Sequence, residues 1–461
     1  MALKNILPEE SLQQCELDIL KAPTSVEKSN IYTKMEMIYY YQLGQFDKAY
    51  ECAKQAFLCN TSDTRLTMNY LLCAEKYLKE STKDCSIIVY TIMKNEIGNI
   101  EGWLENIKDA DGIYVLDTGS TDGSYEKMLS LKEKYPQLHV DRKIYTEFRF
   151  DDARNDNLKM VPEMANTICW TIDLDERFVE NWYQITKNAF IKHPYFYKLS
   201  YGYAYTHNSD GSVREKLLYD KCHRRLGAYW ELPIHEQLLY GELKSIYTDG
   251  IVNLGEDIIV HHYQNDKTNR IQYVNLLEKR IDENPFDLEA INHLATEYTT
   301  HQIDFQKELD TRFLLLSRGI QCNSGWKECM AGNIAWSLSR TNPAIAKEFY
   351  KMAIAFNPKL RTYYLRYVQF LLDNNEITSS NIKEVEALLQ TMSKICTQQD
   401  SWKDSKENWT WYPFYLLGRC EEIVGKDATF NFQTAEAYDD IPEWCIQYID
   451  KYLGDSNERR H

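Results

Sequence analysis

The stretch that decides the fold is residues 85–117, which read CSIIVYTIMKNEIGNIEGWLENIKDADGIYVLD. Residues 85–93 and 112–117 are nearly continuous apolar runs, as expected of strands buried on both faces of a parallel sheet. Between them, apolar residues recur at helical spacing, namely Ile100, Trp103, Leu104 and Ile107. A strand, a helix and a strand over about 30 residues predict a right-handed βαβ unit.

The pattern changes on either side of this unit. Residues 1–83 place apolar side chains at three- and four-residue spacing, and residues 267–461 do so again. Residues 84–266 instead carry short β-branched runs broken by Gly, Asp and Asn. We therefore expect an α/β plus all-α protein, with a mixed sheet domain between two helical regions.

Both helical regions carry signs of a repeat. Gly44 is followed by an aromatic residue and by small residues at one helix face, namely Phe46, Ala49, Ala53 and Ala56. A second copy contains Ala346, Tyr350, Ala353 and Pro358. This pattern resembles the tetratricopeptide repeat, and a generic stack of helical hairpins is the alternative. Either kind of hairpin must stack on a neighbour to bury a core.

Composition excludes several classes of function. The 461 residues include 53 Lys and Arg against 69 Asp and Glu, a net charge of −16, which argues against a nucleic-acid partner. No run of ~18 apolar residues predicts a membrane span, and the start Met-Ala-Leu-Lys-Asn lacks the apolar core of a signal peptide. The 12 cysteines include no Cys-x-x-Cys pair, so we expect free thiols in a reducing, cytoplasmic compartment.

An aromatic cluster lies near the end of the chain and contains Trp402, Trp409, Trp411, Tyr412 and Phe414. Large apolar side chains are usually buried, so a core or a dimer contact is favoured over an acceptor surface. The helical flanks leave a homodimer open.

Acidic residues follow two predicted strands of the sheet. Asp117 ends the second strand, and residues 167–176, TICWTIDLDE, end a third strand in Asp173 and Asp175. Ligands of such sheets bind at the carboxyl ends of the strands. Two residues two apart on an extended chain point to the same side, and paired carboxylates there favour a hard cation such as Mg²⁺ or Mn²⁺.

Four motifs in order carry a family resemblance. They are Lys94-Asn95-Glu96, Asp117-Thr118-Gly119-Ser120-Thr121-Asp122, Phe150-Asp151-Asp152-Ala153-Arg154-Asn155 and Asp173-Leu174-Asp175-Glu176. Over roughly residues 84–265 the chain resembles a family-2 glycosyltransferase with a GT-A fold. The flanking repeats, His235-Glu236 and His261-His262 resemble more narrowly the sublancin-type enzymes, which attach a sugar to a cysteine of a bacteriocin peptide.

The resemblance implies a nucleotide-sugar site made of Tyr90, Thr91, Glu96, Asp117, Arg154, Asp173 and Arg224. Asp117 would hold the uracil or ribose, and Tyr90 or Thr91 would line the same pocket. Arg154 would approach the donor sugar or diphosphate, and an ion pair to Asp151 or Asp152 is the alternative. Arg224 and the adjacent Arg225 would meet phosphate, and solvation at the surface is their alternative.

The resemblance also implies a metal site and a base. Asp175, with Asp173 and His262, would hold the cation that bridges the diphosphate. His262 fits better than His261, and a histidine bonded to a backbone carbonyl is the alternative. Glu236 or His235 would take the proton of the acceptor. Because Leu239 stands where a second histidine would be, this motif is not that of a metalloprotease.

These expectations combine into an inverting glycosyltransferase. It would move a sugar from a UDP-sugar, with Mg²⁺ or Mn²⁺, to a side chain of a peptide or protein. One alternative keeps the chemistry but uses a cell-envelope glycan as the acceptor. The other is a scaffold of helical repeats with a decayed sugar-nucleotide domain.

Overall fold

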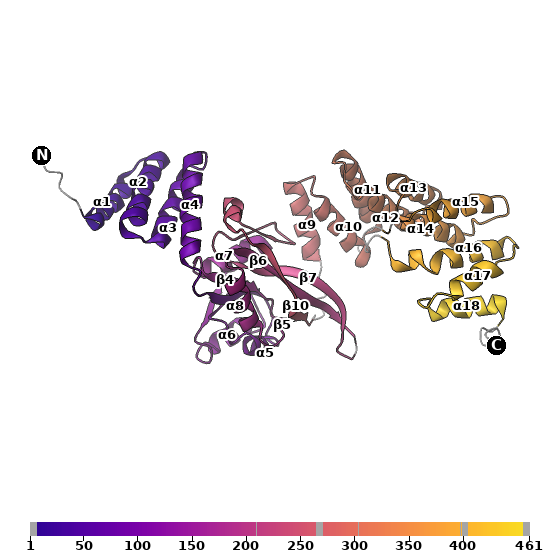
Figure 1. The fold of residues 1–461 in the computed structure, drawn as a ribbon, viewed down its shortest axis with the longest axis horizontal. Coiled ribbons are helices and arrows are strands. Elements are labelled where there is room, and N and C mark those ends of the chain that lie inside the picture. The colour runs from indigo at the N-terminus through magenta and orange to yellow at the C-terminus, as the bar shows by residue number, and fades with distance from the viewer. Residues whose placement is uncertain are drawn as a thin grey trace. The chain divides into compact units, whose positions relative to one another are not determined.

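A computed structural model describes residues 7–208, 210–263, 271–302, 304–396, 398 and 404–454. The chain divides into two compact units, Met1–Asn269 and Arg270–His461. The first unit contains helices and an eight-stranded sheet, and the described part of the second is helical (Figure 1). The expected boundary between residues 266 and 267 lies outside the described residues. The mixed α/β and helical composition agrees with the sequence pattern.

The first unit begins with a layer of helices: α1 Pro8–Lys21, α2 Ser25–Met37, the π-helix η1 Ile38–Leu43, α3 Phe46–Cys59 and α4 Thr64–Glu80. Gly44, with φ 64°, ends η1 in the left-handed conformation that glycine adopts without strain. Ala49, Ala53 and Ala56 on α3 are almost fully buried. The small residues therefore let α3 approach its neighbours closely, as their spacing predicts.

The large sheet contains β1 Ser86–Met93, β2 Gly112–Asp117, β3 Leu138–Arg142, β4 Thr167–Thr171, β5 Glu176–Phe178, β6 Phe196–His207, β7 Val213–Arg224 and β10 Gly250–His262. Its strand order is β3-β2-β1-β4-β7-β6-β10-β5. The strands β3, β2, β1 and β4 run parallel, whereas β7 is antiparallel to both neighbours. A small sheet pairs β8 Tyr229–Glu231 with β9 Gln237–Leu239.

The sheet is covered by α5 Ile100–Asn106, α6 Ser124–Ser130, α7 Phe150–Met160, α8 Trp182–Lys192 and the 3-10 helix η2 Gly241–Ile246. Strand β1 contributes to two cores. Val89 packs in the core that includes Trp103 of α5, and Ile88 packs in the core that includes Leu158 of α7 and Leu78 of α4. Each such buried aliphatic side chain contributes roughly 1.5–3 kcal/mol, which explains why the run 85–93 is apolar on both faces.

The parallel strands bring the predicted acids to one edge. Met93 at the end of β1 pairs with Asp117 at the end of β2, and Tyr90 pairs with Thr171 at the end of β4. The loops after these three strands therefore lie at the carboxyl edge of the sheet, where ligands of open α/β sheets bind.

Glu163 ties the helical layer to the sheet. Its carboxylate accepts from Lys54 Nζ at 2.5 Å, from the Tyr50 hydroxyl at 3.1 Å and from the backbone of Gly227 at 3.0 Å. Burial raises the pKa of Glu163, but Lys54, Arg225 and the Gly227 backbone together outweigh burial, so the pKa lies below its usual value. An ionised Glu163 therefore belongs to the native state of this unit.

The second unit contains α9 Ile271–Glu283, α10 Leu288–Thr300, α11 Phe305–Gln321, α12 Lys327–Leu338, α13 Pro343–Phe356, α14 Arg361–Asp373, α15 Ile382–Ser393, η3 Lys406–Trp409, α16 Tyr412–Ile423, α17 Thr429–Glu436 and α18 Glu443–Leu453. Ala346 and Ala353 on α13 are fully buried. Trp411 is buried, and Trp409 stacks on Arg361 at 3.7 Å. Trp411 belongs to the hydrophobic core, with Tyr412 and Phe414 packed against it, which agrees with the first of the two expected roles, a core or a dimer contact. Trp409 is half-buried, and Trp402 lies outside the described residues.

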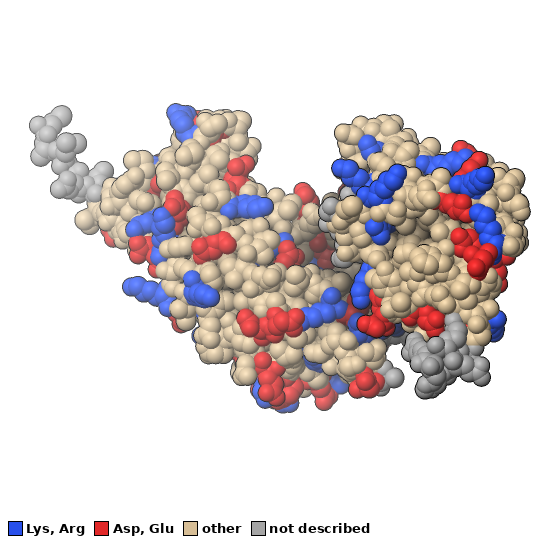
Figure 2. All heavy atoms as spheres, turned by 45° about the vertical axis from the view of Figure 1, so that its right-hand side comes forward, with Lys and Arg blue, Asp and Glu red and all other residues tan. Residues whose placement is uncertain are grey.

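The surface and the cysteines agree with the composition. On the face shown in Figure 2, Lys and Arg side chains are interspersed with Asp and Glu. All 12 cysteines are free. No helix in the described ranges is long and apolar enough to cross a bilayer.

Candidate functional site

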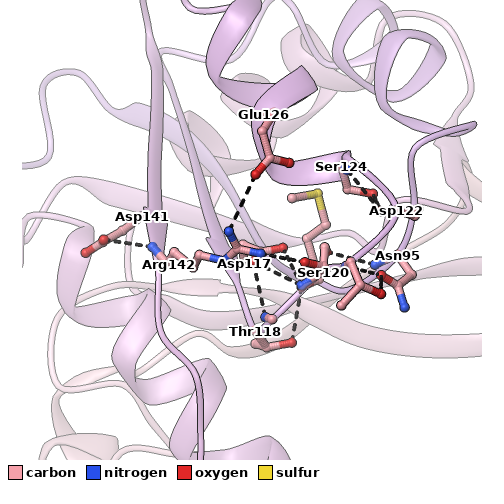
Figure 3. A network of polar contacts seen from close by, with 12 residues as sticks. Asn95, Asp117, Thr118, Ser120, Asp122, Ser124, Glu126, Asp141 and Arg142 are labelled. Carbon is pink, nitrogen blue, oxygen red and sulfur yellow. Dashed lines mark hydrogen bonds and ion pairs between the residues drawn. The ribbon is translucent and has the colours of Figure 1, made fainter.

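The turn after β2 is held by Asp117 (Figure 3). This side chain is fully buried and accepts from the backbone of Gly119 at 3.1 Å and of Ser120 at 3.2 Å. Arg142 at the end of β3 places Nε 2.8 Å from Asp117 Oδ2. The carboxylate is therefore matched by a cation and by backbone donors that rigidify the turn.

The loop after β1 is cross-linked to that turn. Asn95, at φ 58°, donates its backbone N–H to Ser120 Oγ at 2.9 Å and accepts from the Thr121 backbone at 2.8 Å (Figure 3). Glu96 donates its backbone N–H to Ser124 Oγ at 2.8 Å. Its side chain is half-buried and accepts from Asn99 at 2.8 Å. Glu96 and Asp117 thus belong to one rigid rim.

The Asp-x-Asp segment follows β4. The Asp173 side chain is 36% exposed, whereas that of Asp175 is 5% exposed. His262, the last residue of β10, places Nε2 3.6 Å from Asp175 Oδ2. The Nδ1 atom of His262 lies 3.3 Å from the Tyr205 carbonyl oxygen. The contact with a backbone carbonyl, which was the alternative to a role as metal ligand, is therefore present as well. The hydrogen bond to Asp175 raises the pKa of His262, which outweighs the effect of burial.

The three predicted metal ligands do not converge. Asp173 lies beside two cations, with Oδ1 3.5 Å from Arg154 Nη2 and Oδ2 3.9 Å from Lys221 Nζ. Within the described part of the chain, no group of three or more His, Cys, Asp or Glu is arranged to hold a metal ion. Asp175 and His262 remain as a pair of oxygen and nitrogen donors. The Asp175 carboxylate is an oxygen ligand that suits Mg²⁺ or Mn²⁺, whereas an imidazole is a donor that Mg²⁺ takes less readily. Both ions commonly complete their coordination with waters and substrate phosphates.

Arg154 connects the segment after β4 to the predicted base. Its side chain on α7 is 4% exposed and forms an ion pair with Glu236 as well as with Asp173. The alternative ion pair between Arg154 and Asp151 is absent, because Asp151 pairs with Arg149 at 2.8 Å. Burial lowers the pKa of Arg154, but the two carboxylates outweigh it, so the pKa is raised. Its Nη1 is buried and hydrogen-bonds to no described residue.

Glu236 and His235 lie in the turn between β8 and β9. The turn is strained at Leu232, because its φ of 84° is a value that residues other than glycine rarely adopt. His235, with φ 51°, also lies in the left-handed region, which histidine adopts more often than most residues. Such strain persists where the surrounding structure enforces it, and it is common at functional sites. His235 is exposed, whereas Glu236 borders a cavity of about 660 Å³ together with Lys221 and Trp230.

Tyr90, Thr91 and Arg224 lie inside the protein. The Tyr90 hydroxyl is 2.8 Å from His223 Nε2 and accepts from Trp230 Nε1 at 2.9 Å. Burial lowers the pKa of His223 to about 3, so this ring is neutral. Arg224 donates to the carbonyls of Ala165 and Pro194 and is fully buried, not solvated at the surface. These side chains form the support beneath the rim.

Sequence patterns did not single out Lys221, Trp230 or Glu176. The Arg154 guanidinium lies over the Trp230 ring at 5.4 Å. Glu176 is buried and accepts from the Asp173 backbone at 2.9 Å and from the Tyr203 hydroxyl at 2.7 Å. Burial and the neighbouring Asp173 raise the pKa of Glu176. The position of Glu176 in the motif Asp173–Glu176 could have marked it as a site residue from the sequence. Lys221 lies in β7, a strand with several charged residues, and nothing in the sequence distinguishes it from them.

The comparisons with known proteins show distant similarity. No protein-family model and no curated protein matches the sequence. Among solved structures, the mannosyltransferase PcManGT from Pyrobaculum calidifontis, in complex with GDP-Man and Mn²⁺, aligns with 76% of this chain and 95% of its own at 14% identity and TM-score 0.32. Yeast Tom70 aligns with 98% and 70% at 12% identity and TM-score 0.29. PilF of Pseudomonas aeruginosa aligns with 41% and 72% at 10% identity and TM-score 0.27. Similarity at this level establishes neither a shared fold nor a shared activity.

Proposed function

We propose that this chain is an inverting glycosyltransferase that transfers a sugar from a UDP-sugar to a side chain of a peptide or protein. The observation that carries the proposal is the Asp175–His262 pair at the carboxyl edge of the sheet, with the Arg154–Glu236 ion pair bordering a cavity nearby. Displacement at the anomeric carbon needs a neutralised diphosphate and a deprotonated acceptor. The two pairs supply groups suited to these two needs.

Asp175 and His262 would hold the divalent cation, with diphosphate oxygens and water as further ligands. When bound, the cation supplies positive charge against the departing diphosphate. Lys221, with Nζ 3.9 Å from Asp173 Oδ2, is a protein cation suited to the same anion, and Arg154, already paired with Asp173 at 3.5 Å and with Glu236, would act from behind Asp173. The rim formed by Glu96 and Asp117 is the place for the nucleoside, because it lies at the same edge of the sheet.

Glu236 would act as the base. Its Oε1 is held by Arg154, and no hydrogen bond joins its Oε2 to any residue that the structure describes. The carboxylate is therefore oriented by one oxygen and has the other for an acceptor proton in the cavity. His235 lies in the same turn and is the second candidate for the base, because its side chain is exposed rather than held in place.

The acceptor would lie in a groove made of two neighbouring cavities. The cavity at Glu236 shares Tyr229, Tyr240 and Gly241 with a second cavity of about 860 Å³. The second cavity is lined by Lys54 of α3 and Tyr70 of α4 as well as by the sheet domain. A path from the helical layer to Glu236 suits a polypeptide acceptor, because a polypeptide is long enough to contact both.

The experiment is a transfer and hydrolysis assay with purified protein, a panel of UDP-sugars, Mn²⁺ or Mg²⁺, and either peptides or cell-envelope glycans as acceptors. We expect Asp175→Asn to reduce turnover by at least about 100-fold, because it removes a charge next to the diphosphate. Asp257→Asn, an exposed aspartate on β10, is the matched control and should keep full activity.

Three outcomes separate the hypotheses. Peptide modification by the wild type, lost in Asp175→Asn, supports the proposal. Modification of glycans alone would move the acceptor to the cell envelope. Equal turnover in Asp175→Asn, or no metal-dependent heat of UDP binding in calorimetry, would contradict the mechanism.

A further inference from the structure

The cavity that borders Glu236 runs along the edge of a strand. Three consecutive residues of β9 line this cavity of about 660 Å³, namely Gln237, Leu238 and Leu239. Side chains of a strand alternate between its two faces, so a cavity lined by three residues in a row follows the edge of the strand. The cavity therefore meets the backbone of β9 and not only its side chains.

The two edges of the small sheet of β8 and β9 differ. On the β8 side, the Trp230 backbone donates its N–H to Asn155 Oδ1 at 2.8 Å and accepts from Asn155 Nδ2 at 2.8 Å. Trp230 lies opposite Leu238 of β9. Because the backbone groups of Trp230 point to Asn155, they point away from β9, and this pair of residues shares no hydrogen bond. In such a pair the N–H and C=O of the second residue, Leu238, also point outward, to the other edge of the sheet.

The backbone of Leu238 lacks a partner at that edge. No hydrogen bond from another described residue reaches its outward N–H and C=O. The residue is nevertheless only 5% exposed, and its side chain lies in the core that includes Trp230 and Tyr240. Buried backbone groups are almost always paired, because an unpaired one loses its bonds to water without replacement. A donor and an acceptor left open beside a cavity suit a ligand that supplies both, as an extended peptide backbone does.

A second open edge borders the same cavity. The pairing of β7 with β4 ends at Cys222, opposite Trp170, so residues 213–221 of β7 have no neighbouring strand on that side in the described sheet. The cavity is also lined by three consecutive residues at the end of this stretch, Tyr219, Asp220 and Lys221. An extended segment in the cavity is therefore within reach of the unpaired edges of two strands.

We propose that the acceptor polypeptide lies in this cavity as an extended strand, with its backbone hydrogen-bonded to Leu238 at the open edge of β9 and its reactive side chain at Glu236. The inference rests on the proposed function, since it describes how the acceptor of that reaction is held. Leu238 follows Glu236 by two residues, roughly 7 Å along an extended chain, so a strand paired with the first brings a side chain close to the second. A glycan does not fit this edge, because it has no peptide backbone. Recognition through the backbone leaves most acceptor side chains free to vary.

Hydrogen exchange at single amides tests the pairing directly. The full chain, with ¹⁵N-labelled leucine and tryptophan, is followed by NMR in D₂O with and without a set of nine-residue peptides. Each peptide carries a central Cys, Ser or Thr between flanks rich in Val and Thr. When a peptide binds, exchange of the Leu238 amide should slow by at least about tenfold. The Trp230 amide is the matched control and should not change, because Asn155 already accepts its hydrogen.

N-methylated peptides test the same pairing from the side of the ligand. Methylation removes one backbone donor at a time, and replacement by Ala at the same position removes only the side chain. At one or more positions near the reactive residue, N-methylation should weaken binding by at least about tenfold, whereas replacement by Ala should weaken it less than about threefold. Fluorescence anisotropy of labelled peptides with the full chain provides the measurement.

The outcomes separate this inference from the proposed function. It is overturned if no peptide slows exchange at Leu238, or if N-methylation never costs more than replacement by Ala. Protection of Leu238 that rises with protein concentration in the absence of peptide would assign the edge to a second copy of the chain and would overturn it too. Transfer of sugar to a peptide that leaves Leu238 unprotected would overturn this inference alone. A peptide that protects Leu238 but is never glycosylated would support the pairing and contradict the proposed function.

Discussion

The two units use arginine in opposite ways. In the α/β unit, Arg154 is buried between the carboxylates of Glu236 and Asp173. In the helical unit, Arg340 and Arg366 are exposed and form no ion pair with a described residue, although Arg366 lies over the Tyr363 ring at 5.7 Å. A buried arginine must be matched within the fold, because an isolated buried charge is very costly. An exposed arginine needs no match, because water solvates its charge.

The largest effect is expected when the buried arginine is removed. Arg154→Ala should lower the stability of the α/β unit by about 3 kcal/mol, because it leaves the largely buried carboxylate of Glu236 without its cation, whereas Asp173 is partly exposed and keeps Lys221 beside it. Arg340→Ala should change stability by no more than about 0.5 kcal/mol. Urea unfolding of both variants measures the difference. Equal stability of the two variants would contradict the distinction between a buried, paired arginine in the α/β unit and an exposed one in the helical unit.

The partner of the buried arginine should matter for chemistry. Glu236→Gln should reduce sugar transfer by at least about 100-fold, because the amide cannot take a proton from the acceptor. The matched control is Glu256→Gln, an exposed residue of β10 paired with Lys216. Rates with a peptide acceptor, at saturating UDP-sugar, provide the measurement. A variant as fast as the wild type would remove Glu236 from the mechanism and leave His235 as the candidate.

A change in the packing of α12 against α14 should affect only the helical unit. A Cβ added at Gly332 on α12 would overlap the buried Tyr363 ring of α14. Gly332→Ala should therefore lower the stability of this unit by about 1–3 kcal/mol. Gly325→Ala is the control, because a Cβ there meets open space. Calorimetry should show an earlier transition for Gly332→Ala, and an unchanged transition would show that the α12–α14 contact is looser than described.

The smallest expected effect depends on pH and concerns the contact between α3 and the sheet domain. The folded-state pKa of Glu163 is lowered, since Lys54, Arg225 and the Gly227 backbone together outweigh burial. Its ionised form therefore stabilises the fold above the unfolded-state pKa, and this contribution disappears as the pH falls through the folded-state pKa. Glu163→Gln should cost about 1–2 kcal/mol at pH 7 and progressively less in acid.

A double-mutant cycle with Lys54→Met tests the cause of that dependence. The coupling between Lys54 and Glu163 should be present near neutral pH and vanish in acid, as measured by urea unfolding. A coupling that does not change with pH would show that the charge of Glu163 is not what joins the helical layer to the sheet.

Patterns of sequence predicted the frame of the candidate site better than its pairings. The runs 85–93 and 112–117 revealed parallel strands, and parallel strands place Asp117 and the segment after β4 at one edge. The family resemblance grouped Asp173 with Asp175 and His262, and in the structure Asp173 lies beside Arg154 and Lys221. The resemblance also implied a ligand pocket at Tyr90, and its side chain lies in a core with Trp230 and Cys169.

The amino-acid pattern alone establishes the mixed class of the fold, the helical flanks and the acids after the strands, because periodicity and strand ends are local properties of the chain. Packing decides the rest. The ion pair of Arg154 with Glu236 joins residues 82 positions apart. Gly332 of α12 comes close to the Tyr363 ring of α14 only when the helices stack. Contacts between distant segments depend on register and on how each face is buried, and neither is encoded in any single stretch of sequence.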